Sequence, residues 1–177
     1  MTTNLAPLYS HQRDDWATPH ALFASLDREF RFALDAAAAP DNTKCVCWIG
    51  PEHDTPDQRD ALQGEWRRQT LPGSSHLLRV WLNPPYSQIP EMLRTAWLES
   101  TRGRTTVVCL VPSRTDTRWF HELVWDHERH RPQPYVSLRF LKGRVRFDGG
   151  KHSAPFPSML VIFWCETDPL MPEEARR

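Results

Sequence analysis

The stretch that decides the fold runs from residue 78 to residue 111, LRVWLNPPYSQIPEMLRTAWLESTRGRTTVVCLV. It opens with a predicted strand, Leu78–Leu82, which must end at Asn83-Pro84-Pro85-Tyr86 because successive prolines cannot continue a hydrogen-bonded ladder. Apolar residues then recur at three- and four-residue spacing from Ile89 to Trp97, the pattern of an amphipathic helix. Thr106–Val111 is apolar almost throughout, as in a strand that is covered on both faces. The order strand, turn, helix, strand predicts an α/β fold.

The flanking segments extend this alternation of strands and helices. Leu22, Phe23, Leu26 and Phe30 recur at helical spacing after Pro19, and a short apolar run then ends at Asp35. Further apolar patterns predict a helix around residues 119–124, a hairpin over 135–147 that turns at 142–144, and a strand over 159–164. Strands that alternate with helices predict a mainly parallel sheet with helices on both faces, with antiparallel strands at its C-terminal end.

Candidate functional residues directly follow the predicted strands. Asp35, Asn83 and residues 112–114 each come after one. Because ligands of open α/β sheets bind outside the carboxyl ends of the strands, we expect these residues to converge at one edge. Residues 42–73 are polar and rich in turn formers, which predicts long loops with one short strand at 46–49.

The composition fits one domain. The 177 residues are 40% hydrophobic and 25% charged, which predicts a single unit over residues 1–177, with its core at about 14–165 and a flexible tail at each end. No basic stretch followed by an apolar run opens the chain, and no window is apolar enough to cross a bilayer, so we expect a cytoplasmic protein. The four dispersed cysteines fit reduced thiols, and their spacing predicts no metal site.

The charge is unevenly distributed although the formal net charge is zero. Residues 1–66 carry 5 Lys and Arg against 11 Asp and Glu, whereas residues 102–151 carry 11 against 5. The basic stretch fits contact with nucleic-acid phosphates. Solvated arginines on an ordinary surface fit it equally well.

Asn83-Pro84-Pro85-Tyr86 has the groups that methylation of a ring-conjugated amine requires. The lone pair of such an amine is delocalised into the ring, so the nitrogen is a poor nucleophile until acceptors hold both of its hydrogens. The Asn83 side-chain oxygen and the Pro84 carbonyl can supply these acceptors, and Pro85 stiffens the turn. Because positive charge develops on the nitrogen, the acceptors stabilise the transition state more than the ground state. Tyr86 offers a ring on which an extruded base can stack.

The same four residues resemble the signature of amino-methyltransferases, and the wider pattern resembles the phage-type Dam-like adenine DNA methyltransferases. The segments that carry this resemblance occur in order as DDWATP (14–19), LDAAA (34–38) with Asn42, DAL (60–62) before Trp66, WLNPPYS (81–87), VPSRTDT (111–117) before Trp119, and KGRVRF (142–147). The resemblance extends from about residue 14 to residue 163, which is nearly the whole chain.

The resemblance implies a Rossmann-like, S-adenosylmethionine-dependent methyltransferase fold. Trp16, Thr18 and Pro19 are then expected to hold the cofactor together with the Asp35 loop. A carboxylate at a strand end can accept hydrogen bonds from the methionine ammonium or a ribose hydroxyl. Alanines at 36–39 stand where a glycine-rich loop is usual. Asp60 is implied as a second cofactor contact, with a surface carboxylate as the alternative.

The implied activity is methyl transfer to the N6 amine of adenine in double-stranded DNA, in a bacterial cell and from a phage or prophage gene. Arg114, Asp116, Lys142 and Arg144 are expected to steer or read DNA, because arginine suits phosphates and guanine edges. Salt bridges within the protein are the alternative for each of them. Trp119 is expected in the core, since its apolar neighbours have helical spacing.

Alternatives to this function remain open at the level of sequence. A planar side-chain amide poses the same electronic problem, so a protein glutamine methyltransferase is the second enzyme class. An inactive cofactor-binding or nucleic-acid-binding module is another class, and a proline turn that merely closes a buried strand is the structural alternative for Asn83–Tyr86. The oligomeric state is open as well. Because little chain lies outside the expected core, we expect a short recognition sequence, relaxed specificity, or specificity that a second subunit supplies.

Overall fold

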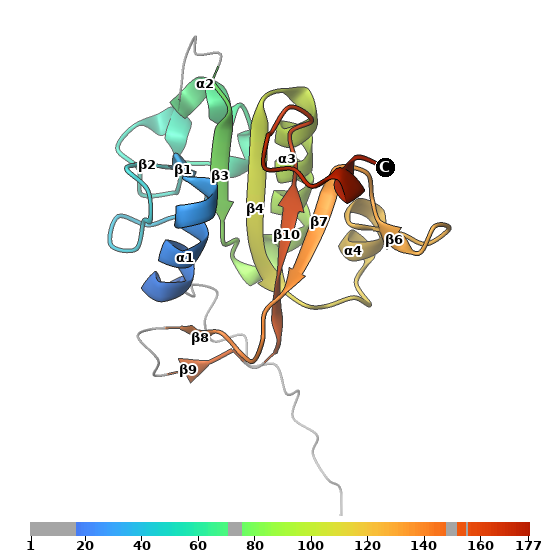
Figure 1. Cartoon of the computed structure of the whole chain (residues 1–177). Helices are drawn as coiled ribbons and strands as arrows, with labels where there is room; N and C mark the ends of the chain where they lie inside the picture. Colours follow the sequence, from blue (N-terminus) through green and yellow to red (C-terminus); the bar gives the residue numbers. More distant parts are fainter. Residues whose placement is uncertain (1–16, 71–75, 148–151, 155) are drawn as a thin grey trace, which may run out of the picture.

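A six-stranded sheet forms the centre of the computed structural model, which describes residues 17–70, 76–147, 152–154 and 156–177 (Figure 1). In spatial order the strands are β2 (Cys47–Trp48), β1 (Leu34–Asp35), β3 (Leu78–Leu82), β4 (Thr105–Pro112), β10 (Ser158–Phe163) and β7 (Val136–Phe140). The first four run parallel, whereas β10 is antiparallel to both of its neighbours. The predicted sheet, mainly parallel with antiparallel C-terminal strands, is confirmed.

Helices cover both faces of the sheet, as predicted, and side chains of the central strands alternate between two apolar clusters. Val107, Cys109 and Val111 of β4 belong to the cluster that includes α3 (Ile89–Arg102) and α4 (Arg118–Leu123). Val108 and Leu110 belong to the opposite cluster, with α1 (His20–Phe30). This double burial explains why β4 has no polar face. Trp119 is buried in the first cluster, as expected.

The segment between β2 and β3 contains more structure than its polar sequence predicts. The short strand β2 falls within the predicted range 46–49, but the 3₁₀ turns η1 (Pro56–Gln58) and η2 (Ala61–Gln63) and the helix α2 (Trp66–Thr70) follow it. The buried carboxylate of Glu99 in α3 accepts hydrogen bonds from the amides of Glu65 and Trp66 at 2.8 and 3.1 Å. Glu99 therefore caps the start of α2 from a distant part of the chain.

The predicted hairpin over residues 135–147 is wrong in its pairing. Strand β7 pairs with β10, and β8 (Arg146–Phe147) pairs with β9 (His152–Ser153), so residues 142–144 form a bend and not a hairpin turn. Hydrogen bonds from Leu141 to Ser158 and from Ala154 to Val145 link the two ladders on either side of this bend. We call residues 141–147, 152–154 and 156–158 the hairpin arm. Figure 1 shows its strands β8 and β9 beyond the edge of the sheet where β3 ends.

The C-terminal segment, predicted to be a flexible tail, is anchored to the sheet. The Asp168 carboxylate is fully buried and accepts two hydrogen bonds from Arg79 of β3, at 2.8 and 3.0 Å, and one from Thr106 of β4, at 2.7 Å. Although burial acts to raise it, these bonds and one from the Leu170 amide hold the pKa of Asp168 below its ordinary value. Met171 is buried beyond it. The predicted N-terminal tail, residues 1–12, lies outside the described residues.

Within the described ranges, no helix combines the length and apolar character that spanning a bilayer requires. No three histidine, cysteine, aspartate or glutamate side chains in those ranges gather closely enough to hold a metal ion. The four cysteines are free thiols; Cys109 and Cys165 are buried, and Cys45 and Cys47 are half-buried.

Removal of the Asp168 carboxylate should destabilise the fold strongly. Asp168→Ala leaves the largely buried Arg79 guanidinium without its partner, so we expect the free energy of unfolding to fall by about 3 to 5 kcal/mol. Urea unfolding measures this change, with exposed Asp57→Ala as the matched control. Equal stabilities of the two variants would show that the C-terminal anchor contributes nothing.

Candidate active site

Strands β1 and β3 end side by side at one edge of the sheet because they run parallel and in a fixed register. Asp35 pairs with Trp81, so Asn83 follows only two residues beyond the level of Asp35. The Ala36 amide donates to the Trp81 carbonyl at 3.0 Å, which extends the pairing past the end of β1. The sequence-based expectation that Asp35 and Asn83 meet at one edge therefore holds.

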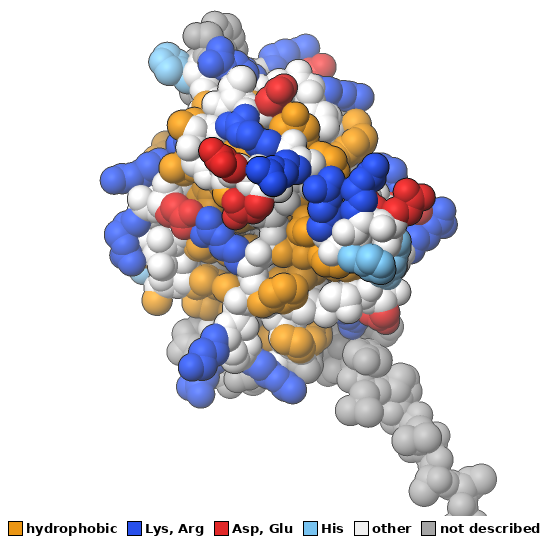
Figure 2. All heavy atoms as spheres, turned by 45° about the vertical axis from the view of Figure 1, so that its right-hand side comes forward, with side chains coloured by type: hydrophobic (Ala, Val, Ile, Leu, Met, Phe, Trp, Pro, Cys, Tyr) orange, Lys and Arg blue, Asp and Glu red, His pale blue; other side chains and the backbone are white. Residues whose placement is uncertain are grey.

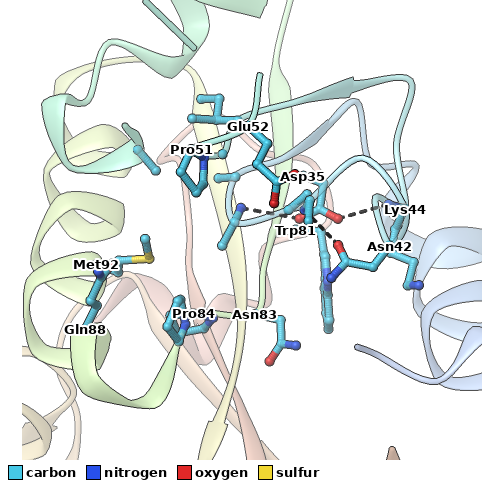
Figure 3. Close-up of a pocket in the computed structure, with 18 of the residues that line it drawn as sticks. Asp35, Asn42, Lys44, Pro51, Glu52, Trp81, Asn83, Pro84, Gln88 and Met92 are labelled. Carbon is cyan, nitrogen blue, oxygen red and sulfur yellow. Dashed lines mark hydrogen bonds between the residues drawn. The ribbon is translucent and has the colours of Figure 1, made fainter. Parts of the chain in front are cut away.

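A pocket of about 680 Å³ opens at this edge, a volume suited to a small molecule. Its walls come from the loop after β1, the loop after β2 and the turn after β3 (Figure 3). Figure 3 shows Asp35, Asn42 and Lys44 on one side, Pro84, Gln88 and Met92 on the other, and Asn83 near Trp81 between them. The pocket thus joins the predicted cofactor loop to the Asn83–Tyr86 turn.

The amides of the alanine run 36–39 all make hydrogen bonds inside the protein. Ala36 bonds to β3, and the Ala38 amide donates to the Ile49 carbonyl at 3.0 Å. The amides of Ala37 and Ala39 donate to the side chains of Asp35, at 3.4 Å, and Asn42, at 2.8 Å. The run therefore differs from a glycine-rich loop that offers bare amides to a ligand. A ligand at this loop would therefore meet side chains, among them Asp35, and not unbonded amides.

Asp35 is a buried carboxylate with an unusual protonation equilibrium. Only 3% of the residue is exposed, and its second oxygen accepts a hydrogen bond from the Lys44 amide at 3.0 Å. Burial raises the pKa of Asp35 to about 6, against the lowering effect of the amides of Lys44 and Ala37. A buried carboxylate of this kind gains most from a cationic ligand, whose charge offsets the cost of desolvation.

The loop after β2 forms a further wall and depends on Gly50. A Cβ at this position would lie 1.8 Å from the Ala38 carbonyl oxygen, so a larger residue cannot fit unless the backbone moves. Glu52 follows and lines the pocket, and Figure 3 shows it above the site with Pro51. Glu52 was not predicted from sequence, because a single acid in a polar loop has no distinguishing pattern.

The charged groups that line the pocket are mainly acidic. They are the carboxylates of Asp35, Asp41, Glu52 and Asp60 and the cationic side chains of Lys44 and Arg59. This balance favours a ligand that carries positive charge.

The Asn83–Tyr86 turn closes the other end of the pocket, and all four residues line it. Pro85 begins the 3₁₀ turn η3 (Tyr86–Gln88), which leads directly into α3. Tyr86 is half-buried, and burial raises the pKa of its phenol, so this hydroxyl stays protonated and neutral. The Tyr86 ring packs edge-on against Phe156, with 5.1 Å between ring centroids.

The other residues predicted to bind the cofactor lie at different distances from the pocket. Thr18 is buried and lines it, whereas Pro19 begins α1 and does not appear in its lining. Asp60 lines the pocket but is exposed, and its side chain accepts a hydrogen bond from the Leu62 amide at 2.9 Å, which caps η2. Trp16 lies outside the described residues.

The predicted DNA-contacting residues are exposed and lie outside the pocket lining. Arg114 and Asp116 are in the loop after β4, and the Arg114 guanidinium lies 5.7 Å from the centroid of the Phe156 ring. Lys142 and Arg144 lie in the bend of the hairpin arm, where Gly143 adopts a φ of 78°. Phe156 was not predicted from sequence, because its contacts join three separate segments.

The fold has a counterpart among solved structures. Among solved structures, the 23S rRNA methyltransferase ErmE has a similar fold, with a TM-score of 0.53 and 11% sequence identity over 90% of this chain and 73% of that chain. This likeness bears on the fold alone, and the expected Rossmann-like fold, a mostly parallel sheet with helices on both faces, is confirmed.

The family follows from sequence comparison. Residues 6–171 match the DNA N-6-adenine-methyltransferase (Dam) family, and the chain belongs to it. The DNA N-6-adenine-methyltransferase of Haemophilus phage HP1 is 34% identical over 154 residues, covering 85% of this chain and 79% of that protein. That of Escherichia phage T1 is 30% identical over 111 residues, which are 62% of this chain and only 40% of the T1 protein. The expected phage-type Dam-like family is confirmed.

Proposed function

We propose that this protein transfers a methyl group from S-adenosylmethionine to the N6 amine of adenine in double-stranded DNA. The observation that carries this proposal is the shared pocket, lined by the acidic loop after β1 and by the Asn83–Tyr86 turn after β3. Membership of the Dam family, with relatives in two phages, supports DNA as the substrate. We propose the bacterial cytoplasm as the place of action and a phage or prophage as the source.

The acidic end of the pocket fits the cofactor. S-adenosylmethionine supplies a methyl group on a positively charged sulfur and also carries an ammonium group. Asp35 would accept from the ammonium or a ribose hydroxyl, since its buried carboxylate gains from a nearby cation. Thr18, Glu52 and Asp60 also line the pocket and are the further candidates for cofactor contacts. The hydrogen-bonded alanine run would position Asp35 and contact the cofactor through methyl groups.

The opposite end of the pocket fits the amine of the target base. The Asn83 side-chain oxygen and the Pro84 carbonyl would accept its two hydrogens and so favour a more tetrahedral, nucleophilic nitrogen. Both acceptors are neutral, so neither requires a charge to be desolvated before the base arrives. The amine nitrogen would take the methyl group as the bond from that group to the cofactor's sulfur breaks. The methylated, positively charged amine would then release a proton to water, so the reaction needs no buried base.

Tyr86 would stack on the adenine once it leaves the duplex. The amine is paired inside double-stranded DNA, so the enzyme must extrude the nucleotide to reach it. A stack of a base on an aromatic ring contributes about 1 to 3 kcal/mol, which offsets part of the cost of unpairing. Because its phenol stays neutral, Tyr86 introduces no charge beside the base.

The hairpin arm and the loop after β4 would hold the DNA backbone. Lys142, Arg144 and Arg146 are exposed on the arm, beyond the sheet edge that carries the pocket. Figure 2 shows lysine and arginine side chains at the foot of the molecule, where the arm lies in Figure 1. Arg114 adds a cation beside Phe156. Two other arginines of the basic stretch form ion pairs on the protein surface, Arg118 with Glu122 and Arg139 with Glu29.

A protein glutamine methyltransferase would use the same acceptors, so it is the second candidate. The basic balance of residues 102–151 and the family membership favour DNA. Transfer of labelled methyl groups to protein and not to DNA would favour the alternative.

Asn83→Ala should lower the rate of methyl transfer by at least about 10²-fold, because one acceptor for the amine is lost. Cofactor affinity should persist, since the acidic end of the pocket is unchanged. Asn83→Asp keeps an acceptor oxygen and should retain more activity than Asn83→Ala. Transfer of labelled methyl groups to unmethylated plasmid DNA measures the rates. Similar rates for Asn83→Ala and the unaltered protein would contradict the role of this residue.

Cofactor binding should weaken in mild acid. The pKa of Asp35 is about 6 in the free protein, so the carboxylate is ionised above that pH and protonated below it. Only the ionised form attracts the cationic cofactor, and the Kd should rise as pH falls below 6, by up to about tenfold per pH unit. Calorimetry between pH 5 and pH 8, a range of about three units around this pKa, measures the dependence. Asp35→Asn should abolish it, whereas exposed Asp60→Asn should preserve it.

Removal of two cations from the hairpin arm should weaken DNA binding and its salt dependence. Each phosphate contact contributes about 0.9 to the slope of log K against log salt, so Lys142→Ala with Arg144→Ala should reduce that slope by about 2. The matched control replaces the exposed Arg102 and Arg104, which precede β4 at the opposite edge of the sheet. An unchanged slope in the arm variant would remove Lys142 and Arg144 from the DNA interface.

A further inference from the structure

Phe156 lies where three functional segments meet. Its ring packs edge-on against Tyr86, with 5.1 Å between centroids and an interplanar angle of 76°. The Arg114 guanidinium lies 5.7 Å from the centroid of the same ring. Phe156 itself lies in the hairpin arm, in the segment between β9 and β10. It therefore touches the catalytic turn and the loop after β4 from within the arm.

The backbone around Phe156 is tied to both neighbours. The Ser113 amide donates to the Pro157 carbonyl at 2.9 Å, and Pro112 pairs in register with Ser158, so the loop after β4 is fixed to the arm. On the other side, the Ala154 amide donates to the Val145 carbonyl at 2.8 Å, and both residues are buried. Phe156 thus lies between two anchored points of the arm.

The bend that carries the exposed cations lies across the arm from Phe156. The Leu141 amide donates to the Ser158 carbonyl, and the Ala154 amide donates to the Val145 carbonyl. Residues 142–144 and Phe156 therefore lie in the two facing segments between this pair of hydrogen bonds. Contacts from Lys142 and Arg144 to DNA phosphates would therefore restrain the backbone segment that contains Phe156. The Phe156 ring is half-buried and packs at the margin of the α1 cluster, which limits its freedom to move independently.

We infer that Phe156 is a positioning residue that fixes the Tyr86 ring relative to the hairpin arm. When the arm contacts DNA, the ring on which the base stacks would then be held at a fixed position relative to that DNA. This inference rests on the proposed function. Phe156 would raise the rate of transfer through Tyr86 and would contribute little to cofactor affinity, because it does not line the pocket.

The contact itself can be tested without activity. The chain has only three tyrosines, so protein labelled with fluorotyrosine gives few ¹⁹F signals, and Tyr86→Phe identifies that of Tyr86. Phe156→Ala should shift or broaden the Tyr86 signal and leave the Tyr135 signal in place. Phe140→Ala, which removes an exposed phenylalanine on β7, is the matched control and should change neither. An unchanged Tyr86 signal in Phe156→Ala would overturn the inference, whether or not DNA is the substrate.

Kinetics test the consequence. Phe156→Ala should lower kcat for methyl transfer to unmethylated plasmid DNA by about 10²-fold, the cost of a small misplacement of reacting groups. The Kd for S-adenosylmethionine should stay unchanged, and Phe156→Tyr, which keeps the ring, should restore most of the rate. In a Tyr86→Ala background, Phe156→Ala should cost little more, because both act through one ring. If the two substitutions together lowered kcat by the product of their separate effects, the inference would be overturned. If the unaltered protein left DNA unmethylated, the proposed function would be contradicted instead.

Discussion

The parallel register of β1 and β3 is the constraint on which the rest of the site depends. Asp35 pairs with Trp81, and the hydrogen bond from the Ala36 amide to the Trp81 carbonyl carries this pairing past the strand end. A slip of one residue would send the side chains of one strand to the opposite face. The large apolar side chains on both faces of β3 and β4 make such a slip costly. The buried core therefore fixes the spacing between the acidic loop and the Asn83 turn.

The pocket that results has charged groups at one end and neutral groups at the other. Its acidic end includes a carboxylate whose burial raises its pKa to about 6, and such a group favours a cation in its vicinity. Its other end offers amide and carbonyl oxygens at Asn83 and Pro84. A methyl cation equivalent would pass from the first region to an amine held by the second. In the proposed mechanism neither end of the pocket would require a buried base, and Tyr86 would stay neutral beside the adenine.

The sequence was sufficient for those features that depend on local pattern. Continuous apolar runs predicted β4 and β10, and the mainly apolar segment 78–82 before two prolines predicted β3 and the turn at Asn83. Helical spacing predicted α1, α3 and α4. Features that depend on distant partners were missed. Helix α2 is capped by Glu99, more than 30 residues away, and the C-terminal segment is held by the bond between Arg79 and Asp168, 89 residues apart. Gly143 suggested a hairpin turn, but the strands before and after it do not pair with each other. Strand β7 pairs with β10 and β8 pairs with β9, and residues 142–144 form a bend between them.

The central claim is that this pocket delivers a methyl group to the N6 amine of adenine. The most direct measurement is to incubate the protein with S-adenosylmethionine labelled in its methyl group and unmethylated plasmid DNA, then digest the DNA to nucleosides and identify the labelled one. The account predicts that the label is found in N6-methyldeoxyadenosine. Label confined to methylated cytosine, or found in protein while the DNA stays unlabelled, would contradict it.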